Sequence, residues 1–222
     1  MDDPSLPEDL HREALRGLGR LNRLGFADGM LWPAVREEME KADRPLVVAD
    51  LACGDGGFLR MVHRRAGARV RLVGVDVSPT ALGHAEEISP PGIRFVASDV
   101  LSLRELPEFG RADVVTCSLF AHHLAARDIV RLLATMRRLA RRRVLLNDLR
   151  RSWTTWWSVF AAARLVTRSP VVHVDSVRSV ASALTAGELA ACASAAGMPG
   201  ATVMRKFPCR QNLDWRVRDE NE

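Results

Sequence analysis

The sequence predicts an α/β protein with a doubly wound, mostly parallel sheet, a helical cap before it and an antiparallel hairpin at its end. Short apolar runs recur after residue 45, and longer amphipathic stretches separate them. Continuous apolar runs suit strands buried on both faces of a parallel sheet, and the stretches between them are long enough for crossover helices. With 222 residues and no linker or repeat, we expect one domain over residues 1–222.

The elements follow in order. In residues 1–44, apolar residues at helical spacing predict two helices of a cap, one around Leu10–Leu21 and one around Trp32–Met39. Residues 45–150 contain the parallel strands. Their apolar runs are Leu46–Leu51, Val70–Val75, Ile93–Ala97, Ala112–Ser118 and Val144–Asn147.

Two further segments complete the chain. Residues 151–183 are rich in aromatic side chains and predict an inserted lid. In residues 184–222, Thr185 and Glu188 form a capping box that opens a helix through Ala196. Two runs split by a proline, Ala201–Phe207 and Gln211–Val217, then predict the hairpin, which brings the sheet to seven strands.

Composition excludes several classes of protein. The chain is 47% hydrophobic and 27% charged, which is ordinary for a soluble globular domain. It begins without an apolar signal region and has no apolar stretch near the ~20 residues that span a membrane, so we expect a cytoplasmic protein. Its four cysteines are widely spaced, which argues against zinc and against a disulfide scaffold.

The first chemical motif lies where the first strand ends. Small residues at Ala52, Gly54 and Gly56 allow a tight turn and a close approach to a bound molecule, and Asp76 ends the next strand, where a carboxylate can accept ribose hydroxyls. No lysine stands nearby, which excludes a P-loop. Asp50 and Asp55 would repel a pyrophosphate but suit an ammonium or sulfonium group, which favours S-adenosylmethionine (SAM).

Four motifs in this order resemble the class I SAM-dependent methyltransferases. They are Asp50-x-Ala52-x-Gly54-x-Gly56, Asp76, Ser98-Asp99-Val100 and Asp113–Ser118. The resemblance covers most of residues 45–217 and implies a Rossmann-like sheet, SAM as cofactor and S-adenosylhomocysteine (SAH) as product. Within that class the chain is similar to the small bacterial UbiE-like enzymes associated with polyketides and other secondary metabolites. That finer similarity is carried by Asn147–Ser152, Ser169–Val172 and Leu184–Leu189.

The resemblance also implies a role for each cofactor-binding position. The methionine part of SAM would lie over the turn and beside its first carboxylate, the positions being Asp50, Ala52, Cys53, Gly54 and Gly56. The ribose and adenine would be held by Asp76, Val77, Asp99 and Val100, and the sulfonium and the methyl acceptor would lie near Cys117 and Ser118. The alternative for the three carboxylates is a local role, as turn or helix-capping residues.

Two adjacent histidines, His123 and His122, follow the fourth strand and are candidate catalytic bases, because imidazole titrates near pH 6.5. The alternative is a structural loop in which one ring bonds to the backbone. Adjacent histidines point in different directions and no third ligand is evident, so no metal is predicted. His173 is a second candidate base, with a structural role as its alternative.

The aromatic residues after the fifth strand are candidates for the substrate pocket. Trp153, Trp157 and Phe160, with Trp156 between them, would form the wall of an apolar acceptor pocket. Aromatic residues on an amphipathic helix also serve as core. Arginines flank the segment, so peripheral contact with a membrane surface is another alternative.

The net charge of +5 raises the question of nucleic acid. The arginine clusters precede strands and so lie at the edge opposite the ligand-binding edge, where we expect solvated faces. These clusters are Arg64–Arg71 and Arg137–Arg143. The sequence therefore favours O-methylation of an apolar or phenolic small molecule, with no nucleic acid as partner. A catalytically inert SAM-binding protein and an RNA methyltransferase are the alternatives, and the sequence leaves the oligomeric state open.

Overall fold

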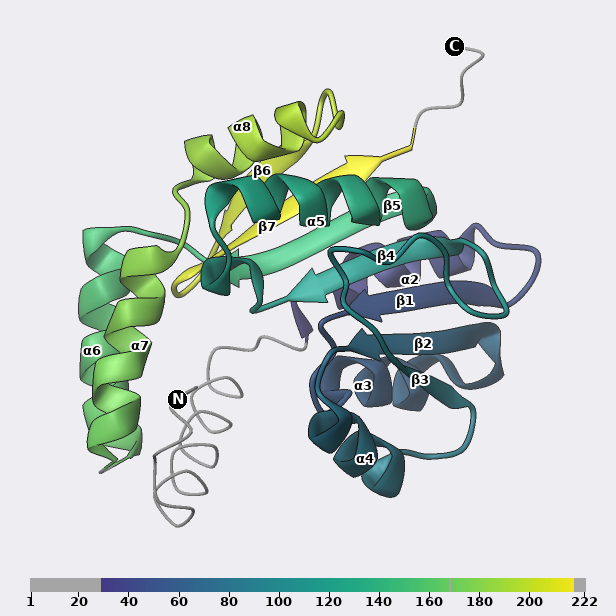
Figure 1. Cartoon of the computed structure of the whole chain (residues 1–222), viewed down its shortest axis with the longest axis horizontal. Coiled ribbons are helices and arrows are strands. Elements are labelled where there is room, and N and C mark those ends of the chain that lie inside the picture. Colours follow the sequence, from purple (N-terminus) through teal and green to yellow (C-terminus); the bar gives the residue numbers. More distant parts are fainter. Residues whose placement is uncertain (1–28, 168, 218–222) are drawn as a thin grey trace.

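The computed structural model describes residues 29–167 and 169–217. Seven strands form one sheet in the order β3-β2-β1-β4-β5-β7-β6 (Figure 1). The first five strands run parallel, and β7 pairs antiparallel with both β5 and β6. The predicted fold class is confirmed. The strands are β1 (Leu46–Leu51), β2 (Val70–Asp76), β3 (Ile93–Ala97), β4 (Ala112–Ser118), β5 (Ala140–Leu149), β6 (Thr202–Lys206) and β7 (Arg210–Arg216).

Helices cover both faces of this sheet, and each face has its own apolar core. One core joins the sheet to α2 (Trp32–Glu40), α3 (Gly57–Ala66) and α4 (Pro79–Ile88). The other joins it to α5 (Ala126–Leu139) and α8 (Ala186–Ala195). In α5, apolar residues spaced three and four apart lie against the sheet, and Leu132, Leu133 and Met136 are fully buried.

Strand β5 is longer than predicted. The sequence analysis began this strand at Val144 because arginines precede it and were expected to be solvated. The structure instead carries Arg143 inside the sheet, where it is 6% exposed. Its guanidinium bonds to Asp214 of β7 and to Glu37 and Glu38 of α2, so a buried arginine is stabilised there by three carboxylates.

Two connections depart from the simple strand–helix alternation. Between β3 and β4 the described chain forms a loop, not a crossover helix, and it fills the core with Leu103 and Leu106. The helix predicted around Leu10–Leu21 lies outside the described residues. The helix predicted around Trp32–Met39 is confirmed as α2, which packs Val35 and Met39 against one face of the sheet.

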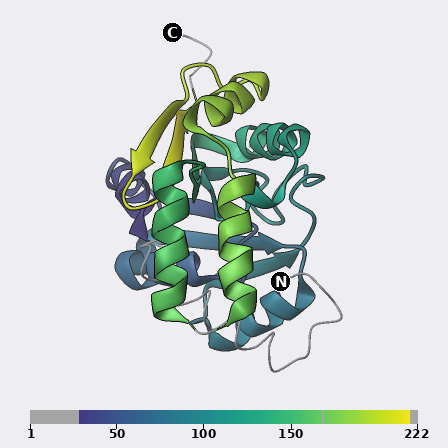
Figure 2. The same cartoon turned by 90° about the vertical axis from the view of Figure 1, so that its left-hand side faces the viewer.

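The aromatic segment forms a pair of helices that stands apart from the sheet. α6 (Trp153–Val166) and α7 (Pro170–Ser182) lie side by side beyond the end of β5 (Figures 1 and 2). Ser152 caps α6 by accepting a hydrogen bond from the Thr155 amide. The chain returns through α8, whose capping box of Thr185 and Glu188 is confirmed. None of the helices among the described residues is long and apolar enough to cross a membrane.

Candidate functional site

The order of the strands places the candidate site. From β1 the chain adds β2 and β3 on one side, whereas β4 and β5 lie on the other. In open parallel sheets, ligands bind beyond the carboxyl ends of the strands at the point where this direction reverses. That point lies between β1 and β4, and the predicted cofactor-binding positions follow β1, β2, β3 and β4 at this edge.

The turn between β1 and α3 is built for close approach. Ala52, Gly54 and Gly56 all have positive φ angles, of 56°, 54° and 75°. At Gly56 a Cβ atom would stand 2.8 Å from the ring of Phe95, so only glycine fits without a shift. At Gly54 a Cβ atom would meet nothing within 4 Å, so this part of the turn faces open space. The backbone itself is therefore the surface that a ligand would touch.

Asp76 ties this turn to β2. Its carboxylate accepts hydrogen bonds from the Gly54 amide at 2.8 Å and the Ser78 amide at 2.9 Å. The local role considered as an alternative is thus present, yet each carboxylate oxygen has two lone pairs and can accept further donors. Beside it, the apolar Val77 side chain is 70% exposed. A carboxylate next to an exposed valine matches what a ribose and an adenine ring require.

The third strand contributes Asp99 and Val100. Asp99 is exposed, and its Oδ1 accepts a hydrogen bond from the Leu101 amide at 2.9 Å. Val100 is 4% exposed and its side chain packs in the core. Only the backbone of Val100 is therefore suited to a ligand, in agreement with the amide role that the resemblance implies. An acceptor carboxylate in this position suits the amino group of adenine.

Asp50 lies deeper than its predicted role suggested. It is 3% exposed, and the hydroxyl of Thr116 on β4 donates to its Oδ1 at 2.6 Å. Thr116 is the residue that pairs with Asp50 across the two strands, so the strand register positions this contact. The sequence analysis did not identify Thr116, although its place two residues before Ser118 puts both on the same face of β4.

Cys117 and Ser118 were both predicted to lie near the sulfonium, but their side chains are on opposite faces of β4. Cys117 is fully buried in the core, and burial raises the pKa of its thiol well above the ordinary range, so it stays neutral. Its side chain packs in the core, and its predicted place near the sulfonium stays a prediction. Ser118 lies on the opposite face, and its Oγ accepts a hydrogen bond from Asn147 Nδ2 at 2.7 Å. The side-chain oxygen Oδ1 of Asn147 is buried without a hydrogen-bond partner.

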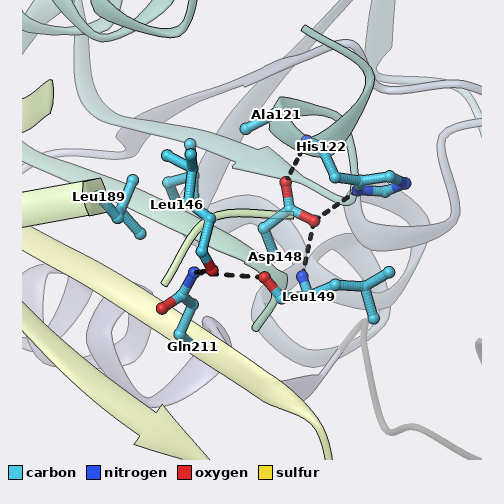
Figure 3. Close-up of a pocket in the computed structure, with 8 residues that line it drawn as sticks. Ala121, His122, Leu146, Asp148, Leu149, Leu189 and Gln211 are labelled. Carbon is cyan, nitrogen blue, oxygen red and sulfur yellow. Dashed lines mark hydrogen bonds and ion pairs between the residues drawn. The ribbon is translucent and has the colours of Figure 1, made fainter. Parts of the chain in front are cut away.

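The two candidate histidines occupy different environments. His122 is 9% exposed, and its Nδ1 lies 2.6 Å from Oδ1 of Asp148, a buried residue of β5 (Figure 3). His123 is exposed, and its ring centroid is 4.1 Å from that of His122. The sequence analysis did not identify Asp148. A signal was present, because two polar residues, Asn147 and Asp148, end an otherwise apolar buried run.

A small apolar pocket lies beside the pair of His122 and Asp148. Leu146 and Leu189 line it, together with the amide-bearing Gln211. Gln211 donates hydrogen bonds from Nε2 to the carbonyl oxygens of Leu149 and Leu184 (Figure 3). The third candidate base, His173, lies elsewhere, on α7, where its Nε2 is 2.8 Å from the carbonyl oxygen of Thr167. This contact occupies His173 structurally.

The aromatic residues of α6 form a cluster at this edge. Trp156 stacks on Phe160 with ring centroids 5.1 Å apart, and Trp157 meets both rings edge-on. Trp156 also packs against a small core that contains Leu149, the last residue of β5. Trp153 is 80% exposed and Trp157 59% exposed, so their predicted place in a pocket wall stays a prediction. Trp156 makes the contact that connects this cluster to the strand edge.

Comparison with known proteins agrees with this geometry. The family described as a methyltransferase domain matches residues 48–143. None of the curated proteins matches the chain.

Solved structures show the same fold at low identity. The plantazolicin methyltransferase BpumL, in complex with a triazolic desmethylPZN analog and SAH, is 14% identical with a TM-score of 0.72, over 96% of this chain and 92% of that one. A putative O-methyltransferase from Nostoc punctiforme PCC 73102 is 17% identical with a TM-score of 0.65, over 92% and 59%. CalO1, a methyltransferase in calicheamicin biosynthesis in its SAH-bound form, is 23% identical with a TM-score of 0.62, over 93% and 57%.

The residues present fit SAM as the cofactor. The open backbone at Gly54 suits the amino-acid part, and the carboxylates of Asp76 and Asp99 on either side of the exposed Val77 suit a nucleoside. The methyltransferase domain matched over residues 48–143, together with the strand order and this donor set, supports a SAM-dependent methyltransferase.

Proposed function

We propose that the enzyme transfers the methyl group of SAM to an oxygen atom of an apolar or phenolic small molecule of the polyketide type. The observation that carries this proposal is the aromatic cluster of α6. Trp156 stacks on Phe160, and Trp156 and Leu119, the residue that follows β4, both pack against the small core that contains Leu149 at the end of β5. An acceptor bound between this cluster and Ser118 would have an apolar, aromatic surface on one side and the cofactor on the other.

Within this proposal each cofactor-binding residue has a defined task. The turn of Ala52, Cys53, Gly54 and Gly56 supports the methionine part by its backbone. Asp76 accepts the ribose hydroxyls, Val77 packs on the adenine, and Asp99 accepts from the adenine amino group. Asp50 acts by its negative charge from beneath the turn, since its carboxylate is held by Thr116.

The placement of the arginines supports a small molecule in preference to RNA. The basic clusters lie toward the amino ends of β2 and β5, where several of their guanidinium groups have partners within the protein. Arg71 lies over the ring of Phe109, and Arg138 donates to the carbonyl oxygen of Leu103. An RNA methyltransferase needs its basic surface around the mouth of the active site.

SAM supplies an electrophilic methyl group on a sulfonium, and the protein supplies position. Holding the acceptor oxygen about 3–3.5 Å from the methyl carbon converts a bimolecular step into an effectively unimolecular one, which can lower the barrier by roughly 7–11 kcal/mol. The helix pair of α6 and α7 would also keep water from the reacting atoms. The proton released by the acceptor must pass to a base or to water.

Two similar structures support a natural-product acceptor. BpumL is a plantazolicin methyltransferase and CalO1 acts in calicheamicin biosynthesis. The proposed UbiE-like subgroup would place this enzyme with other modifiers of secondary metabolites.

Calorimetry and a transfer assay test the proposal together. We expect titration with SAH to show binding at one site, and labelled methyl to move from SAM to phenolic polyketide mimics. Binding of SAH without transfer to any phenol would favour the inert SAM-binding alternative. Salt-sensitive binding of RNA that competes with transfer would favour the RNA alternative. Absence of SAH binding would contradict the assignment of the site.

A further inference from the structure

We propose that Asp148 is a positioning residue that holds His122 as the base receiving the acceptor's proton. This inference rests on the proposed O-methylation and assigns the proton transfer that the reaction requires. It selects one of the two adjacent histidines and adds a partner that the sequence did not reveal.

The geometry around Asp148 is the first support. Asp148 is 3% exposed at the carboxyl end of β5, and three groups of the protein surround its carboxylate. Oδ2 accepts a hydrogen bond from the His122 amide at 2.9 Å. Oδ1 accepts one from the Leu149 amide at 2.6 Å and lies 2.6 Å from His122 Nδ1. Both ends of His122, backbone and ring, are therefore fixed by one carboxylate.

This contact determines the tautomer of His122. An ionised carboxylate can only accept hydrogen bonds, so at 2.6 Å the Nδ1 atom must carry its proton. In a neutral imidazole the other nitrogen, Nε2, then carries the lone pair. A histidine held in this way is a directed proton acceptor, and the carboxylate stabilises the imidazolium that forms.

The position of η3 brings the ring of His122 close to the proposed acceptor site. The imidazole projects away from the apolar pocket of Leu146 and Leu189 (Figure 3). It belongs to the short helix η3 (Ala121–His123), which starts three residues after Ser118 and packs against α7 and β5. His122 thus lies between the end of β4 and the helix pair that carries the aromatic cluster.

Charged and titratable residues occur on each element packed around this ring. They are Asp148 on β5, His123 on η3, Arg210 on β7, and His173, Asp175 and Arg178 on α7. The ring of His122 contacts Asp148 by its Nδ1 atom and His123 by its ring face. Asp148 is the group that determines which nitrogen carries the proton.

The proton transfer balances as follows. A lone pair of the acceptor oxygen forms the bond to the methyl carbon, and the carbon–sulfur bond breaks with its electrons remaining on sulfur, which leaves neutral SAH. The hydroxyl proton passes to His122 Nε2. The resulting imidazolium is paired with the carboxylate of Asp148, and the proton leaves to solvent before the next turnover.

The test compares Asp148→Asn and His122→Gln with the wild-type enzyme on substituted phenols whose pKa values run downward from about 10. We expect both variants to lose kcat/KM by a factor of about 10² or more on the most basic phenol. We expect the loss to shrink as the phenol becomes more acidic, because an ionised phenol needs no base. The fall in wild-type kcat/KM on the acidic side of the pH profile should be absent in His122→Gln.

Controls separate this role from a structural one. Both variants should still fold and should bind SAH with nearly wild-type affinity; the melting temperature should fall to a similar extent in both, because each loses the same buried contact between Asp148 and His122. His84→Gln, an exposed histidine on α4, is the matched control and should keep the wild-type rate. A loss that is equal for all phenols, or a loss in His123→Gln that follows phenol pKa while His122→Gln does not, would overturn the inference. If wild type itself methylates no phenol, the proposed function fails first, and that result is distinct.

Discussion

The two ends of strand β5 both bury charge, but they do so in different ways. At the amino end, Arg143 meets Asp214, Glu37 and Glu38 in a network where every charged group has an opposite partner. At the carboxyl end, the side-chain oxygen Oδ1 of Asn147 is buried without a partner, and Asp148 fixes the ring of His122, whose other nitrogen is the proposed proton acceptor. A closed network stabilises the fold, whereas an incomplete one has capacity left for a ligand.

The closed network connects three elements of the fold. Glu37 and Glu38 come from α2, Arg143 from β5, and Asp214 and Arg216 from β7. The Arg143 guanidinium contacts Asp214 with two hydrogen bonds, of 2.8 and 2.6 Å. Burial by itself lowers the pKa of Arg143, but the carboxylates of Asp214 and Glu37 outweigh burial and raise it. The arginine therefore stays charged at every accessible pH.

The largest expected effect comes from opening this network. Arg143→Leu leaves the buried carboxylate of Glu38 and the partly buried carboxylate of Asp214 with one cation fewer, which costs about 3–5 kcal/mol when a buried pair is broken. Urea denaturation of the variant should show this loss, whereas its affinity for SAH should change little in the folded state. If Arg143→Leu lost SAH binding but kept its stability, the amino end of β5 would serve the ligand and not the fold, contrary to the comparison above.

A second substitution tests the carboxyl edge of the same sheet. Asp76→Asn keeps the size of the side chain but loses one acceptor for the amides of Gly54 and Ser78 and for the proposed ribose hydroxyls. We expect the affinity for SAH to fall by about 100-fold, which is about 2.7 kcal/mol. The cost in stability should be nearer 1 kcal/mol, the usual value of one hydrogen bond.

Calorimetry with SAH and urea denaturation measure the two quantities separately. Asp43→Asn is the matched control, because Asp43 is exposed before β1 at the opposite edge and should leave both unchanged. A loss of stability larger than the loss of affinity would mean that Asp76 serves the turn more than the ligand.

The two ends also differ in how far the sequence predicted them. Apolar runs gave the bounds of β1, β3 and β4, and the small residues and Asp76 placed the turn, because strand burial and backbone conformation are local properties. Arg143 was misassigned because its partners stand far away in the sequence. The same reason hid Thr116 and Asp148, whose roles depend on strand register. The sequence also did not show which face of β4 the side chain of Cys117 occupies, and the structure packs it in the core.

The smallest expected effect concerns acid. Hydrogen bonds from Lys41 and Arg143 lower the pKa of Glu37 from 4.5 to about 2. A carboxyl group whose pKa is lower in the folded state stabilises the fold above its unfolded pKa, and that contribution is lost as the pH falls from about 4.5 toward 2. Because the Glu37 side chain is 41% exposed, solvent screens these pairs and we expect about 1 kcal/mol or less.

Glu37→Gln isolates this contribution from that of the other carboxyl groups. At pH 7 the variant should be less stable than wild type by that amount, and most of the difference should be lost by pH 2, where Glu37 of the wild type is itself becoming protonated. Raising the salt concentration should shrink the difference at pH 7, since screening weakens exposed pairs. The affinity of Glu37→Gln for SAH at pH 7 should equal that of wild type. The closed network lies at the amino end of β5, whereas the proposed SAH site lies at the carboxyl edge of the sheet. A difference that persisted unchanged at pH 2 would show that Glu37 stabilises α2 by packing and not by its charge.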